Sequence, residues 1–119
     1  KGKTNWDDNL EEGVYEVVRK KYRNKKASVL SKGEEWDLDF DDIRWTSRCP
    51  VFDTPLDYFA ESIQDNSVTL NRIDDIFGYI NGNVNVISYK ASKMKRNTSV
   101  KELKQMVEYL NKQELDKNK

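Results

Sequence analysis

The chain has 119 residues, a length that fits one small domain with a modest hydrophobic core. Basic and acidic side chains number 21 each, so the formal net charge is zero. A single cysteine and no histidine exclude an internal disulfide and leave a structural zinc without its usual ligands. No apolar run is long enough to span a bilayer, so we expect a cytoplasmic protein of phage or bacterial type with no membrane partner.

The two signs of charge are segregated along the chain. Basic blocks occupy residues 19–26 and 90–104, whereas residues 34–42 are strongly acidic. If the fold brings the basic blocks together, they form a surface suited to phosphate groups, as in nucleic-acid-binding proteins. Ordinary solvated helix faces explain the same runs, so charge alone leaves both interpretations open.

The first part of the chain has the apolar spacing of a helix that runs from Trp6 to about Arg23. The apolar face of this helix carries Leu10, Val14, Val17, Val18 and Tyr22. A polar stretch through Ser31 to Gly33 then indicates a linker or turn.

Residues 36–43, WDLDFDDI, alternate apolar and acidic side chains and predict a short strand. Asp39 or Asp41 is placed to cap a short helix through Ile43 and Trp45. Residues 49–59, CPVFDTPLDYF, predict a tight hairpin or loop, because a proline stands on each side of the Asp-Thr pair. The side chains of this segment that we expect to be buried are Val51, Phe52, Leu56 and Tyr58.

The second half of the chain predicts two strands, SVTLNRI at 67–73 and NVNVIS at 83–88, joined by a loop that contains Gly78. A helix is expected from Tyr89 to about Asn97, and SVKE at 99–102 is a capping box that opens a last helix. The apolar stripe of the last helix comprises Val100, Leu103, Met106, Val107 and Leu110. The residues after it are expected to fray, and both Trp6 and Tyr109 are expected to pack in the core or between helices.

These elements predict a single α+β domain over residues 1–119. Its parts are an N-terminal helical and extended support (1–48), a strand–loop–strand–helix core (49–98), and a C-terminal helix with a tail (99–119).

The core segment resembles the ββα-metal finger of HNH endonucleases, in particular the phage and homing type. The pieces that carry the resemblance stand in order between Cys49 and Leu110: CPVF, LNRID, GY, GNV, VIS, a lysine at position 95 and SVKELKQMVEYL. The five central pieces, from LNRID to the lysine, are much more specific in this order than one short motif. The resemblance implies a DNA endonuclease that uses one Mg²⁺ or Mn²⁺ ion.

The HNH pattern implies a role for each matching position. Asn71 stands where the metal-binding aspartate would be, Arg72 where the general base would be, Asn83 at the bracing asparagine, and Ser92 at the second metal ligand. Arginine at the base position is usual in the phage branch, so Asn71 and Ser92 are the true departures. An engineered change from aspartate to asparagine would also explain Asn71.

Amide and hydroxyl oxygens bind Mg²⁺ more weakly than carboxylates, so we expect reduced metal affinity. Asp74, or Asp75 beside it, would supply a carboxylate if the end of the strand turns toward the helix; turn residues or caps are the alternative for both. Arg72 stays charged and cannot accept a proton, but it can grip the scissile phosphate. The alternative for Arg72 is an ion pair with one of these aspartates.

Two functions follow from this comparison. The first is a metal-dependent DNA endonuclease, active as a homodimer where both strands are cut. The second is a catalytically degenerate HNH fold that binds DNA or a protein without cutting. In either case we expect four cationic residues of the core helix to face phosphates: Lys90, Lys93, Lys95 and Arg96.

Overall fold

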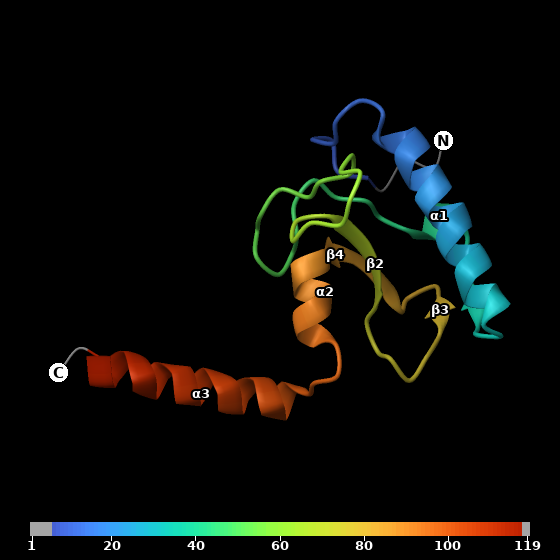
Figure 1. Ribbon diagram of the computed structural model, residues 1–119. Coiled ribbons are helices and arrows are strands. Elements are labelled where there is room, and N and C mark those ends of the chain that lie inside the picture. The colour runs from blue at the N-terminus through green and yellow to red at the C-terminus, as the bar shows by residue number, and fades with distance from the viewer. Residues whose placement is uncertain (1–5, 118–119) are drawn as a thin grey trace.

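The computed structural model describes residues 6–117 and has the mixed α+β class expected from the sequence. Within this range the helices are α1 (Val14–Ser31), α2 (Tyr89–Lys95) and α3 (Val100–Lys117), with one 3₁₀ turn, η1 (Phe40–Asp42). The strands are β1 (Trp36–Asp37), β2 (Val68–Arg72), β3 (Tyr79–Ile80) and β4 (Val84–Ser88). They form two small sheets, a parallel β1–β3 pair and an antiparallel β2–β4 pair (Figure 1).

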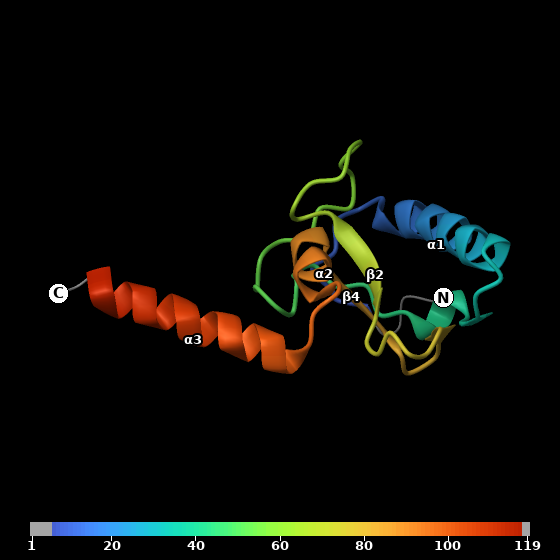
Figure 2. The same ribbon diagram turned by 60° about the horizontal axis from the view of Figure 1, so that its bottom comes forward.

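The β2–β4 pair lies at the centre of the fold, with α1 on one side and α2 on the other (Figure 1, Figure 2). Its register places Val68 opposite Ser88 and Arg72 opposite Val84. Helix α2 follows β4 without a linker, because Ser88 Oγ accepts a hydrogen bond from the backbone N–H of Ala91 and caps the helix. The two predicted strands and the predicted helix after them are therefore present in the expected order.

Helix α1 begins and ends later than the apolar spacing predicted. It begins at Val14 rather than Trp6, because the carboxylate of Asp7 holds the preceding segment in a turn by accepting hydrogen bonds from Ser47 and from the N–H of Asn9. It continues past Asn24 to Ser31, where Gly33 adopts φ +73°. The N–H groups of Gly33 and Glu34 then bond to carbonyls of the last turn, as in a Schellman motif.

The core is rich in aromatic rings that bridge α1, η1 and the segment around Trp45. Trp6 packs against it, in contact with Tyr15, Phe40 and Trp45, which confirms its predicted packing role. The predicted strand around Trp36 is only the two residues of β1, and η1 ends at Asp42 instead of continuing through Ile43 and Trp45. Asp39 is the N-cap residue of η1, and together with Asp42 it forms the capping box.

Residues 49–55 form a tight turn, in which the N–H of Cys49 donates to Thr54 O and the N–H of Asp53 donates to Cys49 O. Leu56 and Tyr58 are buried as expected. Val51 and Phe52 were predicted to be buried but are exposed, because the turn points them away from the core.

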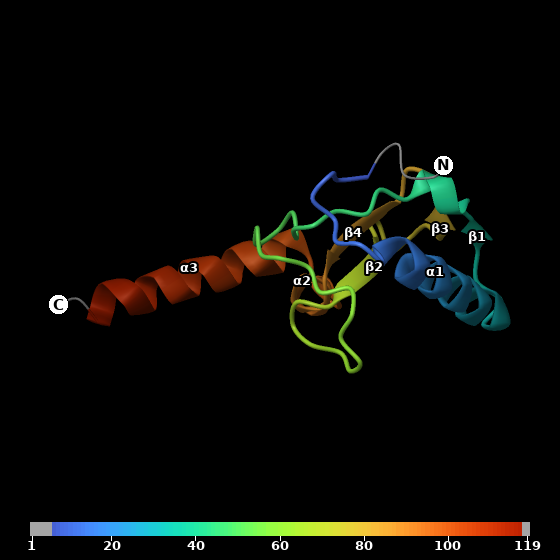
Figure 3. The same cartoon turned by 90° about the horizontal axis from the view of Figure 1, so that it is seen from above.

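Helix α3 projects away from the rest of the protein (Figure 3). Its capping box is formed as predicted, since the Ser99 N–H donates to the Glu102 carboxylate and the Glu102 N–H donates to Ser99 Oγ. None of its residues is buried, so the expectation that Tyr109 packs inside is wrong, and the helix continues to Lys117 where fraying was expected. Within residues 6–117, no helix combines the length and the apolar character needed to cross a membrane.

Candidate functional site: a cationic groove along β2

A groove of about 290 Å³ runs along the outer edge of β2 and between the ends of α1 and α2. We call it the β2 groove. Helix α1 contributes Lys25, β2 contributes residues 69–72, and the loop and strand after β2 contribute Asp75 and Tyr79. The end of α2 and the residue after it contribute Ser92, Lys95 and Arg96.

The β2 groove collects positive charge from both basic blocks of the sequence. Lys25 belongs to the first block, Lys95 and Arg96 belong to the second, and Arg72 adds a fourth cation. Asp75 is the only carboxylate in its lining, and the acidic stretch at residues 34–42 does not reach it. The fold therefore brings the two basic blocks together and keeps the acids elsewhere.

Arg72 ends β2 and lies over the ring of Tyr79, with its guanidinium carbon 5.4 Å from the ring centroid. Its Nη1 donates at long range to two carbonyls, Asp75 O at 3.4 Å and Phe77 O at 3.5 Å. Within residues 6–117 Arg72 forms no ion pair, so the alternative interpretation, a pair with Asp74 or Asp75, is not seen. Most of the N–H donors of its guanidinium are left for a ligand in the groove.

The ring of Tyr79 lies against the guanidinium of Arg72. The Tyr79 ring stacks on Trp36 with centroids 5.2 Å apart, and Lys25 Nζ lies 5.3 Å from the same ring. The ring of the buried Tyr79 thus lies close to two cations from different elements, Arg72 of β2 and Lys25 of α1, because the face of an aromatic ring attracts positive charge.

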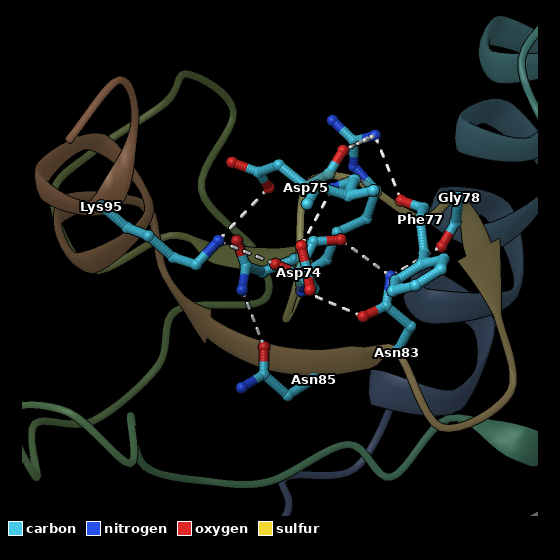
Figure 4. A network of polar contacts seen from close by, with 10 residues as sticks. Asp74, Asp75, Phe77, Gly78, Asn83, Asn85 and Lys95 are labelled. Atoms are coloured by element: carbon cyan, nitrogen blue, oxygen red, sulfur yellow. Dashed lines mark hydrogen bonds and ion pairs between the residues drawn. The ribbon is translucent and has the colours of Figure 1, made fainter. Parts of the chain in front are cut away.

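Lys95 joins the end of α2 to the end of β2. Its ammonium donates to Arg72 O at 2.9 Å and pairs with the Asp75 carboxylate at 3.3 Å (Figure 4). The side chain is partly buried by these contacts. Lys95 therefore pairs with Asp75 and links two elements that line the groove; its predicted contact with phosphate stays a prediction.

Asn83 braces the loop between β2 and β3, as the sequence predicted. Its Oδ1 accepts from the N–H of Asp74 at 2.9 Å, and its Nδ2 donates to Asp74 O at 3.0 Å and to Gly78 O at 2.9 Å (Figure 4). The side chain is buried and does not line the groove. Asn83 is therefore a positioning residue: it holds the loop that carries Asp75, and Asp75 lines the groove.

Asp74, which was predicted as a metal ligand, turns away from the groove. Its carboxylate accepts from the N–H of Ile76 at 3.0 Å and closes a turn. This is the local capping role that acids often have after a strand. Asp75, not Asp74, is the aspartate that lines the groove.

Asn71 from β2 and Ser92 from α2 both line the groove. The Nδ2 of Asn71 donates to Asn85 Oδ1 at 3.0 Å across the strand pair, which leaves its own amide oxygen free for another contact. The side-chain oxygens in the lining of the groove are thus the amide oxygen of Asn71, the hydroxyls of Thr69, Tyr79 and Ser92, and the carboxylate of Asp75.

This donor set does not fit a divalent metal ion well. Mg²⁺ and Mn²⁺ prefer carboxylate oxygens, and the one carboxylate here already pairs with the ammonium of Lys95. A positive charge at that distance also raises the free energy of a second cation in the same space. The part of the chain that the structure describes contains no group of three or more histidine, cysteine, aspartate or glutamate side chains arranged so that they could hold a metal ion.

The remaining two predicted DNA-contacting lysines lie outside the groove. Lys93 pairs with Asp65 at 3.6 Å and lies 5.1 Å from the ring of Tyr89, and Lys90 lies 5.4 Å from the ring of Phe52. Helical periodicity explains the division, because positions 92, 95 and 96 share one face of α2.

Lys25 is the groove residue that the sequence did not single out. It stands in a block of six cations, and only the three-dimensional path of α1 decides which of them reaches β2. Searches against protein-family models, curated proteins and solved structures find no match to this chain, so the likeness to HNH enzymes rests on the sequence pieces and remains a prediction.

Proposed function

We propose that the chain binds DNA by holding the phosphate backbone in the β2 groove. The observation that carries this proposal is the convergence of Lys25, Arg72 and Arg96 on one groove from three separate parts of the fold. Lysine and arginine side chains gathered along a track are the usual basis of affinity for nucleic-acid phosphates.

Arg72 is the residue best placed to hold a phosphate. Its guanidinium is supported by Tyr79, and only Nη1 is used by the protein among the described residues. A guanidinium held in this way offers two parallel donors to phosphate oxygens, with little side-chain freedom left to lose.

The extent of the cationic surface favours a chain of phosphates over a single small anion. A second hollow continues from the β2 groove toward α1, and the two share Lys25, Thr69 and Leu70. The second hollow adds Lys21, Asn24 and Ser28 from α1. Successive phosphates of one strand would therefore meet donors from α2, β2 and α1 in turn.

DNA binding without hydrolysis is the function that the groove supports best, and it corresponds to an HNH-like fold with a degenerate metal site. A metal ion in the groove would need the carboxylate of Asp75, and this carboxylate already pairs with Lys95. Metal-dependent cleavage is the second candidate, and it is favoured by one observation: Asn71, Arg72 and Ser92 line the same groove, as the HNH pattern requires.

Salt-dependent binding of a fluorescent DNA duplex tests the first candidate. We expect Arg72→Ala to weaken binding about tenfold and to lower the slope of log affinity against log salt by about one. Arg23→Ala is the matched control, because Arg23 is an exposed arginine of α1 outside both hollows, and its loss should leave affinity nearly unchanged. Equal affinities of the parent and Arg72→Ala would contradict the proposal.

Nicking of supercoiled plasmid separates the two candidates. The parent chain and Asn71→Asp are incubated with Mg²⁺, with Mn²⁺ and with a chelator. We expect no cation-dependent nicking by the parent, because the carboxylate that the described lining offers a metal is that of Asp75, which pairs with Lys95. Nicking by the parent that the chelator abolishes would establish the endonuclease instead, and nicking by Asn71→Asp alone would mark the chain as a disabled nuclease.

A further inference from the structure

The loop between β2 and β3 carries large apolar side chains in water directly beside the groove. Ile76 is 85% exposed and Phe77 is 54% exposed. They follow Asp75, which lines the groove, so this apolar tip is continuous in the chain with the cationic surface. Adjacent exposed apolar residues of this size usually mark a contact site.

The exposure of the tip is built into the fold. Asn83 holds both ends of the loop through its three hydrogen bonds to Asp74 and Gly78. Inside the loop, the N–H of Phe77 donates to Asp74 O and the N–H of Ile76 donates to the Asp74 carboxylate. Five hydrogen bonds therefore hold the two side chains outward, and a ligand that meets them does not have to order the loop first.

Gly78 fixes the far end of the loop against β1. A Cβ atom at this position would lie 2.6 Å from the Cβ of Glu35 and 2.9 Å from its backbone oxygen. Only glycine allows this close approach, and the next residue, Tyr79, then stacks on Trp36. The apolar tip is thus anchored on both sides by contacts that leave it in solvent.

The tip is also tied to the residue that we assign to phosphate binding. Arg72 Nη1 donates to the carbonyl oxygens of Asp75 and Phe77, on either side of Ile76. The adjacent negative charge is reduced, because Asp75 pairs with Lys95. A strand whose phosphate lies on Arg72 would therefore have a neighbouring base within reach of an apolar surface.

From these contacts we infer that Ile76 and Phe77 form a base-contacting subsite, in which the Phe77 ring stacks on an unpaired or unstacked base of the bound strand. The inference rests on the proposed function and deepens it, since the groove holds phosphates and the tip holds a base. Stacking on aromatic side chains accepts every base, because each has a π face, and apolar wedges at the edge of a basic surface act on nucleic acid in the same way.

Two probes of equal length and equal charge test the subsite: a fluorescent single-stranded oligothymidylate and an abasic oligomer with the same phosphate backbone. We expect the parent chain to bind the base-bearing strand about tenfold more tightly. Phe77→Ser should lose most of this preference while it keeps the affinity for the abasic strand and the salt dependence. Phe77→Trp should retain the preference, and its fluorescence should be quenched by oligothymidylate but not by the abasic strand.

Ile63→Ser is the matched control, since Ile63 is an isoleucine that is 70% exposed and lies outside the groove, and Ile76→Ser is its counterpart in the tip. Equal affinities of the parent chain for the two probes, both weakened about tenfold in Arg72→Ala, would overturn the subsite and leave the proposed function standing. Absence of binding to either probe would overturn the subsite, and absence of binding to the DNA duplex as well would overturn the proposed function. A Phe77→Ser chain that keeps the base preference but changes its oligomeric state would show that the tip contacts protein.

Discussion

Helices α1 and α3 have the same length of 18 residues and both carry an apolar stripe, but their surroundings differ completely. Helix α1 buries Val14, Val18 and Val29, whereas no residue of α3 is buried. Aromatic residues from η1 and from the segment around Trp45 supply a partner surface for α1. This difference shows that an apolar stripe with helical period predicts an amphipathic helix. It does not predict whether another part of the same chain covers the stripe.

The largest expected effect compares equivalent valines of the two helices. Val18 is fully buried in α1, so Val18→Asp places an unpaired charge in the core and should lower the free energy of unfolding by more than about 4 kcal/mol. Val107 lies exposed on α3, so Val107→Asp should change it by less than about 0.5 kcal/mol. Urea unfolding followed by tryptophan fluorescence measures both, and similar losses in the two variants would break the comparison.

Removal of the loop brace should have the next largest effect. Asn83→Ala leaves the N–H of Asp74 without its partner and removes one hydrogen bond from each of the carbonyl oxygens of Asp74 and Gly78, which keep the N–H groups of Phe77 and Ile80 as donors. We expect a loss of about 3 kcal/mol in the free energy of unfolding, at about 1 kcal/mol for each of the three hydrogen bonds. Asn81→Ala, at an exposed asparagine two residues away, is the control and should be nearly neutral. If both changes prove neutral, the rigid loop on which the base-contacting subsite depends is not supported.

A smaller, pH-dependent effect is expected where the N-terminal segment joins the body. Hydrogen bonds from the Ser47 hydroxyl, then from the N–H groups of Asn9 and Ser47, lower the pKa of Asp7 from 3.8 to about 2. The folded state thus binds its proton less readily than the unfolded state, so the stabilisation is present above the unfolded pKa and is lost as the pH falls through this range. The stability difference between the parent and Asp7→Asn should shrink on acidification, and a difference that grows would contradict this linkage.

The smallest effect is expected from removal of α3. A chain that ends after Ser99 should keep its free energy of unfolding within about 1 kcal/mol, because α3 contributes no buried residue. Sedimentation of both chains over a range of concentrations tests the homodimer predicted from the sequence. If the full chain associates and the shortened one does not, a second copy covers the α3 stripe, and the contrast with α1 holds only for the single chain.

Local patterns predicted those parts of the fold that local chemistry decides. The alternation of apolar and polar side chains within each segment predicted β2 and β4. The start of α2 and the Ser99–Glu102 capping box depend on hydrogen bonds between residues three positions apart. The bracing role of Asn83 followed from the resemblance to HNH enzymes, and its hydrogen bonds are those of a loop brace.

The rest of the fold and of the groove depends on contacts between segments that are distant in the sequence. The start of α1 depends on Asp7 meeting Ser47, and the β1–β3 pair depends on Glu35 meeting Gly78. The Lys95–Asp75 pair, which decides how well the groove suits a metal, joins residues 20 positions apart. No periodicity in the sequence encodes these contacts, which is why Lys25 was predicted only as part of a basic block, whereas Arg72, Lys95 and Arg96 were predicted individually from the resemblance and the charge of the core helix.

The buried Cys49 offers a built-in reporter of how the protein opens. Its Sγ accepts a hydrogen bond from the N–H of Ser88, at the junction of β4 and α2. A thiol reagent reaches this sulfur only when the junction separates, and no other thiol in the chain competes for it. The rate at which the reagent labels Cys49 in native buffer therefore measures how often the junction of β4 and α2 opens. The same measurement can be made with and without DNA.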